Sequence, residues 1–238
     1  MLPGGGTVFF VTEDAHRYLF NLEEREEGGT PDIVGAIRCG LAFRLKEAVG
    51  HRAIMAREQE HWEAVRRAWA ACPQIALLGN VEAPRLAIAA FMIRHGRTYL
   101  HHNYVAALLN DLFGIQVRAG CMCAGPYALR LLGIDGTLAR QYEAALLQGD
   151  EVVRPGFVRL NLNYFVSARE VRFIVDAVLF VAEHGWKLLP AYTFLADTGE
   201  WRHRSEKKYA LRHRKWLGQM KFQEGSIHWP GRGQGRGQ

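Results

Sequence analysis

A glycine-rich segment with two cysteines and an arginine gives the first indication of chemistry. It reads Arg118-Ala-Gly-Cys-Met-Cys-Ala-Gly-Pro126, so that Cys121 and Cys123 follow the arginine closely. Loops of small residues often carry function. A guanidinium lowers the pKa of a nearby thiol and favours the nucleophilic thiolate, or it holds a carboxylate through two hydrogen bonds. The segment therefore predicts a reactive loop.

The same cysteines have two other interpretations. A structural zinc site needs four ligands, and Cys121 and Cys123 have no second Cys/His pair at zinc-finger spacing, which leaves His101 and His102 as distant partners. Two buried structural thiols are the other interpretation, although apolar neighbours would suit them better than glycines. Four cysteines in 238 residues are also too few for a disulfide framework, which favours a reducing compartment.

A second candidate site lies where Gly28-Gly29-Thr30-Pro31-Asp32 opens a helix. Thr30 is expected as the N-cap residue, Pro31 as the first helical residue, and Asp32 in the first turn, where its charge suits the helix dipole. Free backbone N–H groups and the threonine hydroxyl at such a corner suit a phosphate. The alternative is that Thr30 only caps its helix.

Arg159 is the third candidate, because it lies on the polar face of a strand predicted over 157–165. The alternating pattern points Val158, Leu160, Leu162 and Tyr164 to one face, and Arg159, Asn161 and Asn163 to the other. An arginine on that polar face is suited to an anionic ligand. A solvated strand face explains the same pattern.

The elements that must position these residues follow from hydrophobic periodicity and from turn residues. Strands are expected at 7–11, 74–79, 86–94, 115–118 and 157–165, and helices at 31–49, 51–72, 104–113, 127–132, 137–147 and 168–183. Strands interleaved with helices predict an α/β or α+β domain with helices packed on a sheet.

Composition bounds the class of protein. Hydrophobic residues make up 49% of the chain, which is enough for a proper core, and neither a signal peptide nor a membrane span is evident, so a cytoplasmic protein is expected. The net charge of +6 is concentrated in the tail, because ten of the 30 lysines and arginines lie between Arg202 and Arg236. The charge excess therefore describes the tail, whose glycine-rich end is expected to be disordered.

Four motifs occur in a specific order along the chain. They are Pro3-Gly-Gly-Gly6, Arg25-Glu-Glu-Gly-Gly-Thr-Pro-Asp32, Val117-Arg-Ala-Gly-Cys-Met-Cys-Ala-Gly-Pro126 and Val158-Arg-Leu-Asn-Leu-Asn163. Over about residues 1–185 they resemble the C-terminal half of the cysteine desulfurases and selenocysteine lyases of the class V aminotransferase superfamily. The resemblance implies the type I fold of pyridoxal-phosphate-dependent transferases. Residues 1–47 would end the large cofactor domain, residues 48–188 would form the small α+β domain, and 189–238 would be a basic, partly disordered tail.

The resemblance also implies roles for individual residues. Thr30, with Gly29 beside it, matches the residues that reach the cofactor phosphate of the other subunit in a homodimer. Cys123 matches the persulfide-forming cysteine, with Cys121 as the alternative, and Arg118 stands five residues before it. Arg159 matches the arginine that binds the substrate α-carboxylate. The implied reaction removes sulfur or selenium from a cysteine-like amino acid and passes it to an acceptor protein.

The sequence departs from the family pattern at the cofactor. The Schiff-base lysine of the family precedes the triple glycine, and here the residues before Gly4 are Met1, Leu2 and Pro3. None of the six lysines stands in a matching context. We therefore expect a C-terminal fragment that does not turn over substrate alone. The alternatives are a non-catalytic dimerisation partner of a full-length homologue, or a protein that binds nucleic acid through its basic tail.

Overall fold

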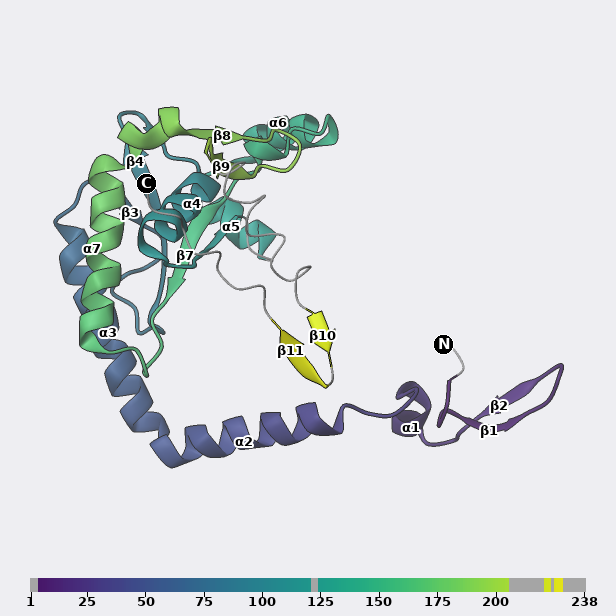
Figure 1. The fold of residues 1–238 in the computed structure, drawn as a ribbon. Coiled ribbons are helices and arrows are strands. Elements are labelled where there is room, and N and C mark those ends of the chain that lie inside the picture. Colours follow the sequence, from purple (N-terminus) through teal and green to yellow (C-terminus); the bar gives the residue numbers. More distant parts are fainter. Residues whose placement is uncertain (1–3, 121–123, 206–220, 224, 229–238) are drawn as a thin grey trace. The chain divides into compact units, whose positions relative to one another are not determined.

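The computed structural model describes residues 4–120, 124–205, 221–223 and 225–228 (Figure 1). The chain divides into two compact units, Met1–Met55 and Ala56–Gln238. Helix α3 (His51–Ala70) runs across this division. None of the described helices is both long and apolar enough to cross a lipid bilayer.

The first unit is a hairpin followed by two helices. Strand β1 (Val8–Val11) pairs antiparallel with β2 (His16–Tyr18), which confirms the strand predicted over 7–11. Helix α1 (Leu22–Glu26) is capped by the side chain of Asn21, and α2 (Ile33–Val49) ends at Gly50, whose φ of 85° favours glycine.

The predicted start of α2 was wrong by two residues. Asp32 is the N-cap residue, and its Oδ1 accepts a hydrogen bond of 2.8 Å from the backbone N–H of Gly35. Both aspartate and threonine are good N-cap residues, so the sequence offers two starts close together. The structure uses the second, and Thr30 lies outside the helix.

Helix α2 exposes apolar side chains around much of its circumference. Within the described structure Val34 and Phe43 are both 67% exposed, and Ile37, Leu41 and Leu45 are also exposed. A helix that is apolar on several sides is normally covered by other protein. The first unit therefore presents a large surface suited to burial.

The second unit is built on an antiparallel sheet with the strand order β3-β4-β7-β6, to which β5 adds beside β4. Figure 1 shows the sheet between two groups of helices. The elements in chain order are β3 (Ile75–Leu77), β4 (Ile88–His95), β5 (Thr98–Tyr99), α4 (His102–Phe113), β6 (Arg118–Gly120), α5 (Gly125–Leu131), α6 (Gly136–Leu147), the 3₁₀ turn η1 (Glu151–Val153), β7 (Phe157–Asn161) and α7 (Ala168–His184).

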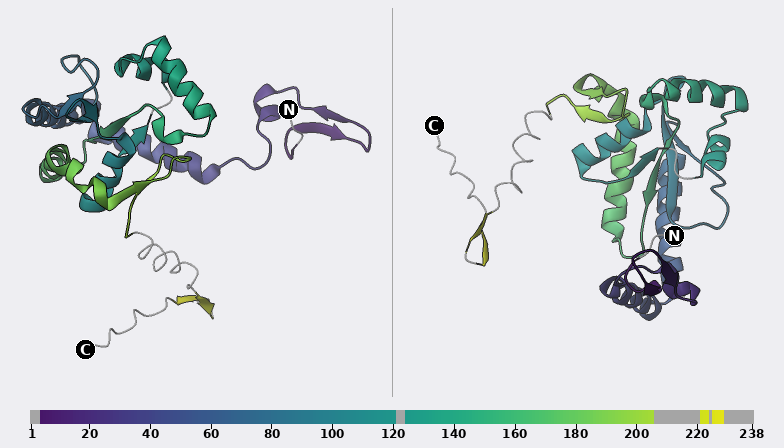
Figure 2. Two further views of the ribbon diagram at one scale, coloured as in Figure 1. Left: turned by 90° about the horizontal axis from the view of Figure 1, so that it is seen from above. Right: turned by 90° about the vertical axis from the view of Figure 1, so that its right-hand side faces the viewer.

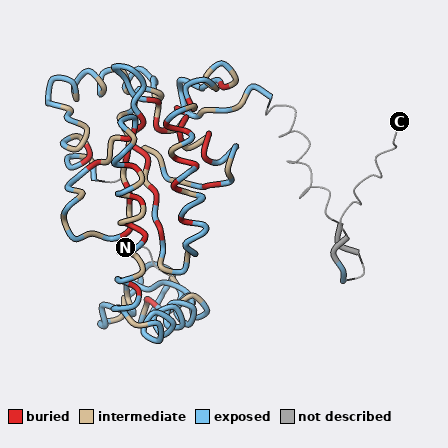
Figure 3. Tube along the Cα trace, turned by 90° about the vertical axis from the view of Figure 1, so that its left-hand side faces the viewer, coloured by how far each residue is buried: buried red, intermediate tan, exposed pale blue. Residues whose placement is uncertain are grey.

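One face of the sheet carries the main core. Side chains of β4 and β7 such as Phe91, Val158 and Leu160 pack with α3, α4 and α7. Figure 2 gives two further views of this arrangement, and in Figure 3 the buried residues, in red, gather in the sheet and in the helices beside it. Trp69 of α3 reaches α7, where its indole N–H donates to the carbonyl of Val175 at 3.4 Å. The opposite face holds a smaller cluster in which Phe157 packs with Ala128 of α5. The predicted alternation of β7 is thus confirmed, although the strand ends at Asn161 instead of at 165.

Helix α7 begins with a reciprocal cap. The hydroxyl of Ser167 accepts from the backbone N–H of Glu170, and the carboxylate of Glu170 accepts from the backbone N–H of Ser167 at 2.8 Å. We expect Ser167→Ala to lower the free energy of unfolding by about 1 kcal/mol. Urea unfolding followed by tryptophan fluorescence measures this change. Ser167→Thr keeps the hydroxyl and should cost less than half as much, and equal losses would contradict the capping role.

The core continues beyond residue 188. The 3₁₀ segment η2 (Gly185–Ala191) leads into the hairpin of β8 (Tyr192–Phe194) and β9 (Trp201–His203). The Tyr192 hydroxyl donates to the carboxylate of Asp111 at 2.8 Å, and the ring of Trp201 lies 4.9 Å from that of Tyr104. A further hairpin joins β10 (Lys221–Gln223) and β11 (Ser226–His228).

Candidate functional site

A cavity of about 520 Å³ opens on the face of the sheet opposite the main core. Strand β4 contributes Ala90, β7 contributes Phe157 and Arg159, and α5 contributes Tyr127. The loop that precedes β4 closes one side with Arg85 and with further residues from Leu78 onward. Of the candidates named from the sequence, Arg159 lies in this cavity.

Arg159 is held in the middle of the sheet. It pairs with Ala90 of β4 on one side and with Arg118 of β6 on the other. Its Nε atom is buried and has no hydrogen-bond partner among the described residues. Because a buried donor without a partner is costly, this guanidinium is suited to an incoming acceptor.

Arg118 and Arg159 are directly opposite each other on neighbouring antiparallel strands, so their side chains leave the same face of the sheet. Two like charges in this arrangement repel each other. Neither forms an ion pair within the described part of the chain. The pair therefore raises the positive potential beside the cavity and favours an anionic ligand. Arg118 itself is exposed and does not line the cavity.

Cys121 and Cys123 lie outside the described residues. Their nearest described neighbours are Gly120, which pairs with Phe157, and Ala124, which lines the cavity. The roles assigned to the two thiols stay predictions.

At the predicted phosphate site of residues 28–32, two of the backbone N–H groups that were expected to be free are already hydrogen-bonded. The backbone N–H of Gly29 donates to the carbonyl of Gly5 at 2.8 Å, and the carboxylate of Asp32 occupies the N-terminus of α2. Thr30 is exposed, and within the described structure its hydroxyl has no partner. In this segment the hydroxyl of Thr30 is therefore the group that we expect to remain available for a phosphate.

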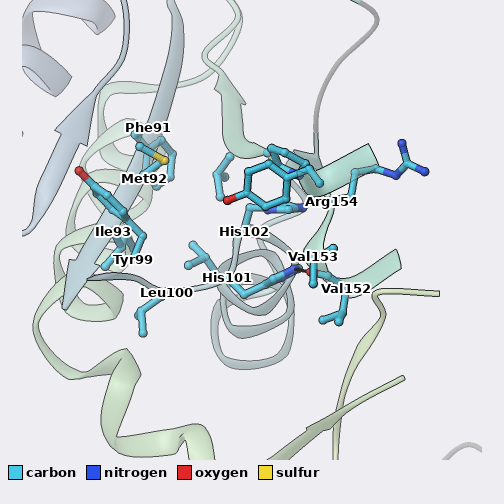
Figure 4. Close-up of a pocket in the computed structure, with 15 residues that line it drawn as sticks. Phe91, Met92, Ile93, Tyr99, Leu100, His101, His102, Val152, Val153 and Arg154 are labelled. Carbon is cyan, nitrogen blue, oxygen red and sulfur yellow. Dashed lines mark hydrogen bonds between the residues drawn. The ribbon is translucent and has the colours of Figure 1, made fainter. Parts of the chain in front are cut away.

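His101 and His102 line a second cavity, of about 350 Å³ (Figure 4). Their rings stack with centroids 4.3 Å apart. His101 accepts from the backbone N–H of Asn103 through Nδ1 and contacts the carbonyl of Val152 through Nε2 at 2.8 Å. Burial lowers the pKa of His101, and it lowers the pKa of His102 to about 4 with a further contribution from His101.

This geometry bears on the zinc interpretation. Both ring nitrogens of a neutral His101 are engaged by the backbone, so this side chain has no lone pair for a metal. Among the described residues there is also no group of three or more His, Cys, Asp or Glu side chains that could hold a metal ion. His101 therefore contributes to the start of α4 through the backbone contacts of its ring, whereas Cys121 and Cys123, the other ligands of the zinc interpretation, lie outside the described residues.

Comparison with known proteins identifies the family. The family model described as aminotransferase class-V matches residues 1–171. The chain belongs to the class V aminotransferase family. This assignment confirms the resemblance drawn from the four motifs, and the mixed fold agrees with it.

Several relatives of this class V chain are named as cysteine desulfurases. The probable cysteine desulfurase of Methanothermobacter thermautotrophicus is 25% identical over 185 residues, which are 78% of this chain and 40% of the relative. The probable cysteine desulfurase 1 of Mycobacterium leprae is 29% identical over 182 residues, or 76% of this chain and 25% of the relative. The chain thus spans less than half the length of these relatives.

A solved structure shares the fold. The apo structure of the cysteine desulfurase from Thermococcus onnurineus NA1 matches with a TM-score of 0.55 and 26% identity, over 76% of this class V chain and 39% of the other. The Escherichia coli cysteine desulfurase CsdA matches with a TM-score of 0.53 at 21% identity, over 79% of this chain and 38% of that one, which supports the fold alone.

Sequence reasoning did not identify Arg85 or Tyr127 as cavity residues. Arg85 stands alone in the loop before β4, and Tyr127 begins a predicted helix, so neither belongs to a motif. Their place in the cavity depends on contacts between distant segments.

Proposed function

We propose that this chain forms the substrate-carboxylate side of an active site for desulfurase chemistry on an amino acid. The observation that carries the proposal is Arg159, whose guanidinium lines the cavity with a buried Nε that has no hydrogen-bond partner among the described residues. Family membership and the names of the relatives support the class of reaction.

In this proposal each residue has a distinct task. Arg159 binds the α-carboxylate and orients the amino acid through two parallel hydrogen bonds. The positive charge of Arg118 favours the thiolate of Cys123, or alternatively of Cys121. That thiolate attacks the sulfur atom of the substrate and forms a persulfide while the bond between this sulfur and Cβ breaks. The electron pair of the broken bond stays with the carbon fragment, which takes up a proton and leaves as alanine, and a sulfur-acceptor protein then removes the outer sulfur.

The cofactor that the family implies is pyridoxal 5′-phosphate, which supplies the electron sink for such chemistry. The described residues do not hold it by themselves. Among them no lysine lines the cavity, and Lys187 contacts the Nδ1 of His184 at 3.1 Å on the surface. Thr30 remains suited to a cofactor phosphate. In this proposal the attachment lysine comes from outside these 238 residues.

A second candidate function is a non-catalytic subunit that pairs with a full-length homologue or with its own copy. The observation that favours it is the exposed apolar surface of α2, which includes Phe43 and Leu41. Co-purification with a lysine-bearing homologue, lost in a Phe43→Glu variant, would support this role. A monomer that is indifferent to such a homologue would count against it.

The catalytic proposal can be tested in a chimera. Residues 1–205, which include the β8–β9 hairpin that packs on α4, replace the matching part of the Methanothermobacter thermautotrophicus relative. Alanine formation from L-cysteine is measured with the cofactor bound. We expect activity in the chimera and a loss of about 100-fold in kcat/KM on Arg159→Gln, because one charge-assisted contact to the carboxylate is removed. Cys123→Ser should stop persulfide formation.

Arg97→Gln is the matched control, because Arg97 is exposed and does not line the cavity. This variant should keep full activity. Alanine formation that survives Cys123→Ser and Cys121→Ser together would refute the thiolate role. If the chimera does not bind the cofactor, binding of L-alanine but not alaninol to the 238-residue chain tests the carboxylate site directly.

A further inference from the structure

The same cavity holds a second arginine that the proposed chemistry does not use. Arg85 follows Pro84 in the loop before β4. Its guanidinium carbon lies 4.1 Å from the ring centroid of Trp62, and one of its terminal nitrogens donates to the carbonyl of Ile88 at 2.8 Å. The stacking and the hydrogen bond fix the guanidinium at the wall of the cavity.

These two contacts use few of the hydrogen-bond donors of the Arg85 side chain. A guanidinium has five N–H donors, and within the described structure the Ile88 carbonyl is the acceptor for Arg85. Stacking on Trp62 occupies one face of the planar group and leaves its edges as donors. Arg85 can therefore be oriented by Trp62 and still bind a ligand.

The charges around the cavity are unbalanced. Arg85 and Arg159 both line it, and no aspartate or glutamate does so among the described residues. Partial burial lowers the pKa of Arg85, against a smaller opposing effect of Tyr127, because desolvation disfavours the charged form. An anion in the cavity would offset this desolvation cost for Arg85 and would supply an acceptor for the buried Nε of Arg159.

The two arginines reach the cavity from different elements of the fold. Arg159 extends from β7, in the middle of the sheet, whereas Arg85 belongs to the loop that precedes β4. A cavity of about 520 Å³ has room for a ligand with two separated anionic groups. An amino acid with a negatively charged side-chain end has this distribution of charge.

We propose that Arg85 binds the side-chain end of the substrate and selects amino acids whose side chain terminates in an anionic group. This inference rests on the proposed function, because it takes Arg159 as the partner of the α-carboxylate. Arg85 is then a specificity residue, and Trp62 is the positioning residue that holds it.

Isosteric amino acids test the proposal on the full 238-residue chain. L-aspartate and L-asparagine have nearly the same shape and differ in side-chain charge, and L-alanine reports the α-carboxylate contact alone. Titration followed by the ¹⁵N NMR signals of the arginine Nε–H groups gives each Kd. We expect L-aspartate to bind about tenfold more tightly than L-asparagine, because it gains a charge-assisted contact.

The variants separate the two arginines. Arg85→Gln should bring the affinities for L-aspartate and L-asparagine within about twofold of each other while L-alanine binding is kept, and Arg85→Lys should keep part of the preference. Arg159→Gln should weaken all three ligands. Arg97→Gln, outside the cavity, should change none of them. Far-UV circular dichroism and an unchanged urea midpoint show that each variant is folded.

The outcomes distinguish the inference from the function on which it rests. Equal binding of L-aspartate and L-asparagine to the unmodified chain, or a preference that survives Arg85→Gln, would overturn the role of Arg85 while leaving that of Arg159 intact. If no amino acid binds, or if Arg159→Gln changes nothing, the carboxylate site itself is wrong. Should Arg85→Gln unfold the protein, the aspartate-to-asparagine ratio in the unmodified chain and in Arg85→Lys still decides the question.

Discussion

Replacement of Gly156 by alanine is expected to lower the free energy of unfolding of the second unit by about 3 kcal/mol. A Cβ atom at this position would lie 2.7 Å from the Cα and carbonyl carbon of Gly120 and 2.8 Å from Cε1 of His102. Gly120 cannot retreat easily, because it pairs with Phe157 in the β6–β7 ladder. His102 is buried and stacked on His101, so it cannot swing away either.

Urea unfolding followed by tryptophan fluorescence measures the effect, since Trp62, Trp69, Trp186 and Trp201 all lie in the second unit. Gly136→Ala is the matched control at the first residue of α6, where the new Cβ would meet the Nη1 of Arg140 at an ordinary 3.7 Å. Its effect should stay within about 0.5 kcal/mol. Similar losses in both variants would mean that the close approach of β6 to Gly156 is not what constrains this glycine.

Much of the second unit could be predicted because its elements carry strong local signals. Gly114 takes φ of 67° at the end of α4, as a glycine stop should. Helical spacing puts Trp62, Val65 and Trp69 on one stripe of α3, and all three are buried. The same spacing would add Met55, yet Met55 is 65% exposed and its neighbour Ile54 is the buried residue of that turn.

Boundaries that depend on a neighbouring strand could not be predicted in the same way. The run over 157–165 alternates throughout, yet β7 ends where its last partner does, at the pair of Asn161 with Ile88. Before Ile88 the chain is a loop, so the pairing ends after one further backbone hydrogen bond, in which the N–H of Leu162 donates to the carbonyl of Ala87 at 2.9 Å. A strand needs its partner for backbone hydrogen bonds, and the length of that partner is not encoded in the run itself.

In the candidate site, too, the positions set by local sequence patterns could be predicted, and the positions set by contacts between distant segments could not. The alternation over β7 predicted the face of the sheet on which Arg159 lies, because period-two alternation is a local property, whereas its role in binding a carboxylate stays a prediction. Arg85 gave no signal, since its place in the cavity depends on Trp62 in α3 and on the fold of the loop before β4. The proposed roles of Cys123, Arg118 and Thr30 rest on the family resemblance and stay predictions.

Acidification from pH 7 to pH 5 is expected to destabilise the second unit through its buried histidines. The pKa of His102 is lowered from 6.5 to about 4, and those of His101 and His61 are lowered too, in each case mainly by burial. The unfolded chain therefore binds more protons than the folded chain between about pH 6.5 and 4, and the free energy of unfolding falls as the pH falls. His102 alone accounts for about 3 kcal/mol once the pH is below both values.

The structure gives a reason why protonation cannot be accommodated locally. Nδ1 of His101 accepts the backbone N–H of Asn103 at the start of α4, and a proton on that nitrogen would place two donors face to face. Its stacked neighbour His102 would then carry a second positive charge in a buried position. We therefore expect acid to destabilise the first turn of α4, including the packing of His102 next to Gly156.

Urea titrations at pH 7.5, 6.5, 5.5 and 5.0, followed by tryptophan fluorescence, test this expectation. The window stays above pH 5 because the pKa values of Glu151 and Glu170 are lowered from 4.5, so these carboxylates lose their stabilising contacts only at more acidic pH. His102→Asn should be less stable than the unmodified chain at pH 7.5, with a visibly shallower dependence on pH. A slope identical to that of the unmodified chain would show that His102 is not the group that takes up the proton, and His101 and His61 would be the next to replace.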